Sequence, residues 1–435
     1  MSGESGTPAQ DRWKQELEKP TEAFFAAFRA MLGEPEGERE LLREAVKTLI
    51  PLVDWEAYLP HVPHGLLGLR AVLRLKPLLP EASFRRALAT QVHAFAHEGR
   101  KFKPQLPSKG SGAWSNIELA LARHKPNLAY GEMLGIEQPE PGHFRRVQAA
   151  IVHDMANMGH KAVMAHRLRE LFEDLEHPKA TGRRLLGLTA WLAATEPEDR
   201  FWAKRAGTRL EGAELRVAWE GAAIEDPETL VRELCDLGLV ELLNRFTARL
   251  KAGAPGRELM AAMAVAAAEK QLDARRDLEG KTAWTFVYLA THAADLAGGG
   301  DPKLWCQAAA MVNLFPTDEE EGRVVSTPAE GQATTERLAD AILDAEPAPA
   351  MGLAEALFDA EGAEPVLRGL AEAASQNDPA FNHSHQTLMV MAAADLAPLL
   401  PAPAQRAMLA AMAKCLANSQ GSSDLGRLAD RALSS

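Results

Sequence analysis

The sequence has few of the features that identify common protein classes. It holds only three cysteines, Cys235, Cys306 and Cys415, none in a CxxC pair, so neither a disulfide framework nor a cysteine-based zinc site is expected. No apolar run reaches the length of about 18 residues that indicates a transmembrane helix. No GxxxxGK[ST], no GxGxxG after a strand and no GxSxG is present, so nucleotide hydrolysis, Rossmann-type cofactor binding and serine hydrolysis lack support.

The composition narrows the class of partner and of fold. The 435 residues carry a net charge of −12, and an acidic surface argues against nucleic acid or an anionic membrane as partner. Hydrophobic residues make up 46% of the chain and only three residues are tyrosines, while alanine and leucine dominate. This composition favours a helical globular protein. Because no basic start precedes an apolar stretch, we expect a cytoplasmic protein.

Helical spacing of apolar residues runs through most of the chain, and no alternating strand is convincing. We therefore predict an all-α fold with residues 1–20 as a flexible N-terminal tail, 21–225 as a first helical repeat and 226–435 as a second, integrated into one domain. One long helical stretch is predicted over 144–176, and another over 228–251. Lys103 to Gly112 and Pro316 to Thr335 are rich in loop-forming residues and are predicted to be lids or binding loops.

The two repeats carry histidine at matching places. His64 and His292 are 228 residues apart (292 minus 64), and His160 and His385 are 225 apart (385 minus 160). The residues around the second pair also correspond under the shift of 225: Asn157 to His160 overlays Asn382 to His385. We interpret the chain as an internally duplicated multi-helical bundle in which two similar halves surround a shared central site.

Four imidazoles related by a duplication are a candidate metal site. Imidazole nitrogen binds iron, zinc, copper and nickel, and helical bundles place metal ligands on facing helices. The histidine segments contain no Glu or ExxH pairs, so a mononuclear site fits better than a carboxylate-bridged di-iron site. The alternative interpretation is that these are helix-start or core histidines that bond to backbone carbonyls.

Further polar residues flank the four histidines. Asn157 and Asn382 lie three residues before His160 and His385, so their amides are candidates either to orient the imidazoles or to cap a helix. His61, three residues before His64, is a candidate to donate a hydrogen bond to one of the four histidines or to carry a proton. His153, seven residues before His160, is another. The remaining histidines of interest are an i, i+4 pair, His93 and His97, and His383, which points elsewhere if its segment is helical.

Three segments resemble the questin oxidase-like family. They are His64-Gly65-Leu66-Leu67-Gly68-Leu69-Arg70-Ala71-Val72, Thr291-His292-Ala293-Ala294, and Asn382 to Met389 followed by Ala392-Ala393. The resemblance runs loosely in register over most of the chain. It implies an oxygenase that acts on polycyclic aromatic polyketides by Baeyer–Villiger-type insertion or ring cleavage, with a mononuclear non-haem iron in some members.

The same resemblance implies that His64, His160, His292 and His385 are the iron ligands. Relatives can add a modified lysine from the last histidine helix, but that helix reads Gln386-Thr387-Leu388-Met389 here; the nearest cationic side chain is Lys161. Apolar residues near the histidines in the sequence are candidates for a substrate lining or for ordinary core; they are Leu66, Met164, Leu289 and Met389.

Three functions remain open at this point. The first is an iron oxygenase that uses dioxygen on an aromatic or other apolar ring, with NADPH as a candidate electron source. The second is a catalytically silent helical protein that binds a hydrophobic ligand or a protein. The third is a zinc hydrolase with Asp154 or Asp295 as general base. The oligomeric state stays open.

Overall fold

The computed structural model is helical throughout the parts of the chain that it describes. These parts are residues 7–54, 64–97, 107–195, 205–206, 208, 215–222, 224, 226–274, 279–314, 323–379, 384–421 and 424–434. Within them the chain forms 21 α-helices and several 3-10 turns, and no strand. The prediction of an all-α protein is therefore confirmed.

The helices divide evenly along the chain. The first half contains α1 (Pro8–Glu18), α2 (Phe24–Leu32), α3 (Gly37–Leu49), α4 (Gly65–Leu75), α5 (Glu81–His97), α6 (Trp114–Ala122), α7 (Pro126–Gly135), α8 (Pro141–Ile151), α9 (His160–Asp174) and α10 (Lys179–Ala194). The second half contains α12 (Pro227–Asp236), α13 (Leu239–Lys251), α14 (Gly256–Leu272), α15 (Glu279–Ala297), α16 (Pro302–Asn313), α17 (Thr335–Leu343), α18 (Pro347–Glu361), α19 (Ala363–Gln376), α20 (His385–Leu396), α21 (Ala402–Asn418) and α22 (Asp424–Ser434).

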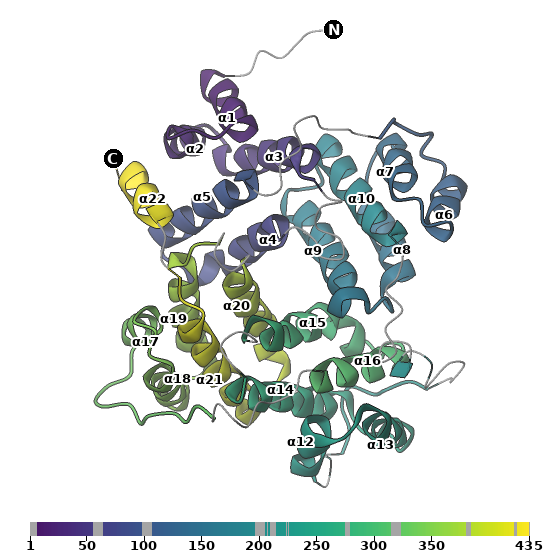
Figure 1. The fold of residues 1–435 in the computed structure, drawn as a ribbon, viewed down its shortest axis with the longest axis vertical. Helices are drawn as coiled ribbons and strands as arrows, with labels where there is room; N and C mark the ends of the chain where they lie inside the picture. Colours follow the sequence, from purple (N-terminus) through teal and green to yellow (C-terminus); the bar gives the residue numbers. More distant parts are fainter. Residues whose placement is uncertain are drawn as a thin grey trace.

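Four helices form the centre of the molecule. Helix α4 packs against α9 and α20, and α15 packs against the same two helices, so the four close a ring (Figure 1). Helices α4 and α20 are apolar on most sides, as is typical of helices buried in a larger body. Helix α9 buries many of its residues as well but carries several charged side chains. The remaining helices surround this ring, and α22 crosses to pack against α2 and α5 of the first half.

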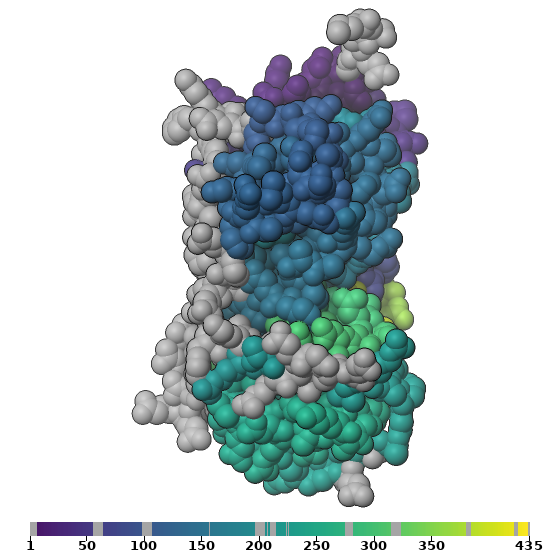
Figure 2. Space-filling model, turned by 90° about the vertical axis from the view of Figure 1, so that its right-hand side faces the viewer, coloured from purple at the N-terminus to yellow at the C-terminus, as the bar shows by residue number. Residues whose placement is uncertain are grey.

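The two halves repeat the same set of helix neighbours. In the first half α7 packs on α10, α8 on α9 and α6 on α7; in the second half α18 packs on α21, α19 on α20 and α17 on α18. Figure 2 shows the first half, in blue, above the second, in green. A duplication would produce this parallel packing, and it remains our interpretation of the chain.

The N-terminal region differs from the prediction of a flexible tail over residues 1–20. Residues 8–18 form α1, which starts at a capping box between Thr7 and Gln10 with Pro8 in the first turn. Trp13 is fully buried and its ring packs against Phe24 and Phe28. The tail prediction is wrong for this segment because one face of α1 carries large apolar side chains that join the core.

The predicted helical stretches 144–176 and 228–251 are each broken. The first stretch splits into α8 and α9, because Asn157, Met158 and Gly159 adopt the left-handed conformation, with φ of 47°, 59° and 75°. The second divides between α12 and α13 at Leu237 and Gly238. The predicted loops are non-helical at their described residues 107–112 and 323–334, whereas Thr335, the last residue of the second loop, already begins α17. No helix in the described part of the chain combines the length and apolar character needed to cross a membrane.

Candidate functional site

Three of the four predicted histidines meet at one end of the central ring of helices. The Nε2 atoms of His64 and His385 are 3.3 Å apart, and their ring centroids are 4.9 Å apart. The ring centroid of His160 lies 5.5 Å from that of His64, edge to face. We call these three residues the histidine cluster. His61, Asn382 and His383 lie outside the described residues.

Helices α4 and α20 approach closely enough to bring His64 and His385 together. Gly68 lies one turn after His64, and a Cβ atom on Gly68 would sit 2.5 Å from the Ser384 side chain. Gln91 of α5 holds both helix starts, since it donates to the carbonyl of Gly65 and accepts from the Ser384 hydroxyl. Glycine at position 68 therefore sets the spacing of the first histidine pair.

His160 is held by the turn that precedes it. Its Nδ1 lies within hydrogen-bond distance of the Asn157 carbonyl, and His160 opens α9 behind the left-handed residue Gly159. An Nδ1–H donated to that carbonyl leaves Nε2 with a lone pair, the usual state of a ligand imidazole. Asn157 thus orients His160 through its backbone, whereas the sequence suggested its side-chain amide; the N-cap of α9 is Gly159, so Asn157 does not cap the helix.

Trp284 of α15 lies beside the histidine cluster, and the sequence analysis did not identify it. Its ring stacks on His160 with centroids 3.8 Å apart and planes 8° from parallel. It also lies 6.1 Å from the His64 ring and 6.0 Å from the His385 ring, centroid to centroid. The available signal was the spacing of Trp284, Tyr288 and His292, which places three ring side chains on one face of a helix.

His292 does not join the cluster. It lies eight residues beyond Trp284 on α15, about 12 Å along the helix axis, and its ring packs against Tyr288 instead. Its Nε2 has no hydrogen-bond partner among the described residues. Complete burial, together with positive charge at His166, His153 and Arg167, lowers its pKa to about 3. The structure therefore does not bring the four predicted ligands to one point.

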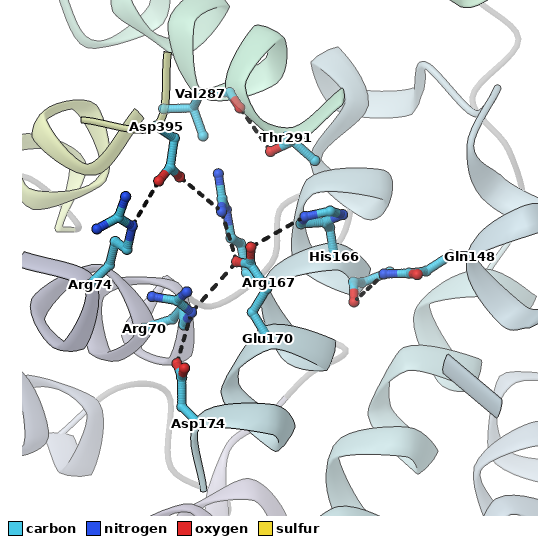
Figure 3. Close-up of polar contacts among 11 residues, drawn as sticks. Arg70, Arg74, Gln148, His166, Arg167, Glu170, Asp174, Val287, Thr291 and Asp395 are labelled. Atoms are coloured by element: carbon cyan, nitrogen blue, oxygen red, sulfur yellow. Dashed lines mark hydrogen bonds and ion pairs between the residues drawn. The ribbon is translucent and has the colours of Figure 1, made fainter. Parts of the chain in front are cut away.

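An ion-pair network occupies the next layer between the same helices. It consists of Arg70 and Arg74 from α4, His166, Arg167, Glu170 and Asp174 from α9, and Asp395 from α20. Figure 3 shows Asp395 between two guanidinium groups, with Arg74 at 2.9 Å and Arg167 at 3.4 Å. Arg167 also pairs with Glu170 at 2.7 Å and is only 2% exposed. Three guanidinium groups balance three carboxylates.

The charges of this network set the ionisation of Glu170. Burial by itself raises the pKa of this carboxyl group. The hydrogen bond from His166 and the charges of Arg167 and Arg70 lower the pKa by more than burial raises it, so the pKa lies well below its ordinary value. At Asp174 burial dominates and the pKa is raised, although Arg70 opposes the shift. Glu170 is therefore a permanent anion that ties α9 to α4.

The other polar residues singled out in the sequence lie elsewhere. His153 contacts Gln307 at 2.9 Å and Asp301 at 3.1 Å, which links the end of α8 to α16. Asp154 pairs with Lys161 at 2.9 Å, so this candidate general base is already bound to a cation. The His93 and His97 rings lie 4.4 Å apart beside Phe25.

The cluster does not form a complete metal site. No three or more His, Cys, Asp or Glu side chains within the described ranges are placed so that they could hold a metal ion. The 3.3 Å between the Nε2 atoms of His64 and His385 nevertheless fits two adjacent ligands, because nitrogens bound at about 2.1 Å lie about 3.0 Å apart at a right angle and about 3.4 Å apart at a tetrahedral angle. The pair supplies two donor positions, and His160 is the nearest third imidazole.

The apolar residues that lie near the predicted histidines in the sequence are buried. Met164 and Met389 lie one helical turn below His160 and His385, and both are buried, as are Leu66 and Leu289. Met389 touches the thiol of Cys415 at 3.7 Å. These contacts place the four side chains in the protein core, consistent with the simpler of the two interpretations of these residues.

Comparison of the chain with protein-family models, with curated proteins and with solved structures returned no match in any of the three.

Proposed function

We propose that the protein is an oxygenase that holds a single iron ion at His64, His385 and His160 and acts on a polycyclic aromatic or polyketide-like ring. The observation that carries the proposal is the convergence of these three imidazoles from both halves of the chain, with the first two at ligand separation. The family resemblance of the sequence points to the same chemistry. His292 is not a ligand in this proposal.

The donor set suits iron that must remain open to other ligands. Three neutral imidazoles and no carboxylate leave coordination positions for dioxygen and for a substrate oxygen. When bound, iron(II) would supply dioxygen binding and reduction. The residues of the chain hold the imidazoles in place: the Asn157 carbonyl selects the tautomer of His160, and Gln91 fixes the starts of α4 and α20. His64 and His160 are buried, whereas His385 is partly exposed.

The proposed overall reaction requires electrons from outside the protein. One atom of dioxygen enters the ring, and the other is reduced to water by two electrons and two protons, for which NADPH is the proposed source. A ring cleavage that incorporates both oxygen atoms needs no such donor. The fate of the oxygen atoms therefore separates the two outcomes.

A second function, a catalytically silent protein that binds a hydrophobic ligand, is favoured by one observation. The described residues contain no complete three-ligand group, and the two facing Nε2 atoms can share a hydrogen bond directly. In that case the histidines serve only to join α4 to α20. The hydrolase alternative has no such support, because Asp154 is paired with Lys161 and Asp295 is exposed on α15, beyond His292, which is not in the cluster.

The test combines iron loading with oxygen labelling. The full-length protein is loaded with iron(II) without oxygen, desalted, analysed for metal, and then given ¹⁸O₂, NADPH and a hydroxyanthraquinone probe. We expect about one iron per chain and labelled oxygen in the product. His64→Ala and His385→Ala should lose both, whereas His97→Ala, at an exposed histidine outside the cluster, should keep both. A wild-type protein that retains no iron would refute the proposal and favour the silent binder.

A further inference from the structure

A small polar cavity lies where α4 and α5 of the first half meet α19 and α20 of the second. The space inside it that is open to the centre of a water molecule is about 10 Å³. By the same measure, about 10–15 Å³ is the smallest space that holds one water molecule. Every residue that lines the cavity is buried, and none of them carries a charge. The cavity therefore has room for one small, uncharged molecule.

Gln386, the residue after His385, brings an unpaired acceptor to this cavity. It is only 1% exposed, and its Nε2 donates to the carbonyls of Ser419 at 2.9 Å and Leu416 at 3.4 Å, at the end of α21. Its Oε1 has no hydrogen-bond partner within the described part of the chain. Buried polar atoms almost always bond either to protein or to an ordered water. The cavity that Gln386 lines is where a partner for this oxygen can sit.

The hydroxyl groups around the cavity offer acceptors rather than donors. Those of Thr90, Ser375 and Thr387 donate to backbone carbonyls three or four residues earlier in the chain. That of Ser384 donates to the side chain of Gln91. A hydroxyl oxygen that has given its hydrogen to another group still has lone pairs. The molecule that fits this cavity therefore donates hydrogen bonds, and water is a donor of the right size.

The first half has an ion pair at the corresponding positions. Under the shift of 225 residues, Gln386 corresponds to Lys161 (386 minus 225). Pro379, which also lines the cavity, corresponds to Asp154 (379 minus 225). Lys161 donates to the Asp154 carboxylate at 2.9 Å and to the carbonyl of Thr195, just after α10, at 3.1 Å. Gln386 keeps the second kind of bond, to a carbonyl just after α21, but Pro379 has no polar side chain that could replace the first. The second half thus has a cavity beside two residues whose counterparts form a salt bridge.

We propose that the cavity is a binding site for one ordered water molecule, which donates one hydrogen bond to Oε1 of Gln386 and a second to a surrounding hydroxyl oxygen. This water satisfies the amide that ties the start of α20 to the end of α21. It also lies at a junction of the two halves, because the cavity wall comes from both. The site is independent of the proposed iron site, since none of the lining residues belongs to the histidine cluster.

A crystal structure of the full-length protein tests the site directly. We expect an ordered water in the cavity, with its oxygen about 2.5–3.0 Å from Oε1 of Gln386. Magnetic relaxation dispersion of ¹⁷O in solution adds a count of the water molecules that stay bound for longer than the protein takes to tumble. Gln386→Met has a similar shape but no acceptor, so it should hold about one such water fewer than the wild type.

The matched control is a second buried glutamine. Gln307 of α16 is also 1% exposed, but both ends of its amide are bonded to His153, at 2.9 Å and 3.0 Å, and it does not line the cavity. Gln307→Met should therefore keep the wild-type number of bound waters. If Gln386→Met fails to fold, the crystal structure of the wild type decides alone.

Two results would overturn the inference. One is a wild-type crystal structure in which Oε1 of Gln386 has no water within hydrogen-bond distance or is bonded to a protein donor. The other is an equal number of bound waters in the wild type and in Gln386→Met. Neither result bears on the iron content of the protein, so failure of this inference is distinguishable from failure of the proposed function.

Discussion

Helices α9 and α20 begin alike and are used differently. Each opens with a histidine behind a left-handed residue, Gly159 or Ser384, and each carries a carboxylate ten positions later, Glu170 or Asp395. His385 faces another imidazole, that of His64, while His160 lies flat on the indole of Trp284.

In both helices the local sequence puts a histidine at the first position. The neighbouring helix determines which group the imidazole contacts. Helix α4 supplies His64 as a second nitrogen donor, and α15 supplies an aromatic face. The site is therefore asymmetric although the helices around it pack in parallel ways. The predictions below probe this asymmetry.

The largest effect is expected where α9 alone carries a buried cation. Position 392 of α20, which corresponds to Arg167 under the shift of 225, is a buried alanine, so α9 reaches Asp395 of α20 with a guanidinium and α20 has no corresponding cation at that position. Arg167→Met should cost about 3 kcal/mol in the free energy of unfolding, measured with urea, because it removes the buried guanidinium that pairs with the half-buried carboxylates of Glu170 and Asp395. Arg169→Met, which breaks no ion pair among the described residues, is the control. Equal losses in the two variants would show that the network adds no stability.

Acid should destabilise the protein partly through His292. Its pKa is about 3 in the folded protein and about 6.5 when unfolded, so between these values the unfolded chain binds the extra proton. Stability is therefore lost as the pH falls from 6.5 towards 3, by up to about 1.4 kcal/mol per pH unit from this group. His292→Leu should flatten the pH dependence of unfolding in that window. An unchanged slope would contradict the burial of a neutral imidazole.

The spacing of α4 and α20 can be changed at one atom. Gly68→Ala should cost about 1–3 kcal/mol, as overpacking of a core does, and should weaken metal binding because His64 moves away from His385. Gly142→Ala is the matched control: a Cβ atom there meets nothing within 4 Å, and alanine favours the helix. Unfolding and Co(II) titration of both variants test whether closeness of the helices, rather than loss of a glycine, is responsible.

The smallest effect is expected at the exposed link between the halves. Asp301 contacts His153 at 3.1 Å, and both side chains are well exposed. Asp301 also caps α16, because its side chain accepts from the backbone N–H of Lys303. Asp301→Asn keeps an acceptor for this cap and removes the charge beside His153, so it should change the free energy of unfolding by less than about 1 kcal/mol, as is usual for surface ion pairs. A larger loss in thermal or urea unfolding would mean that this contact, and not the central ring of helices, joins the halves.

The sequence was sufficient to predict the helical class and three members of the cluster. The helical period of apolar residues is a strong signal, and the shift of 225 correctly paired the starts of α9 and α20. The corresponding signal at Glu170 and Asp395 was present at the same shift but was not recognised. Ion-paired carboxylates such as Asp395 are hard to identify from spacing, because their arginine partners, Arg74 and Arg167, lie on other helices.

The errors arose where tertiary packing decides the outcome. The shift of 228 paired His64, at the start of α4, with His292, which lies within α15, so equal intervals did not mean equal positions in the fold. Periodicity places Trp284, Tyr288 and His292 on one face but does not say which turn meets α9. The break at Asn157 to Gly159 was read as helix, because its left-handed backbone depends on contacts with α15.

The most direct test of the account is the iron content of two single variants beside the wild type. After loading with iron(II) without oxygen and removal of excess metal, the account predicts about one iron per chain in the wild type and in His292→Leu, and less than a tenth of that in His385→Ala. Iron lost equally from both variants would restore the symmetric four-histidine site and contradict the arrangement described here.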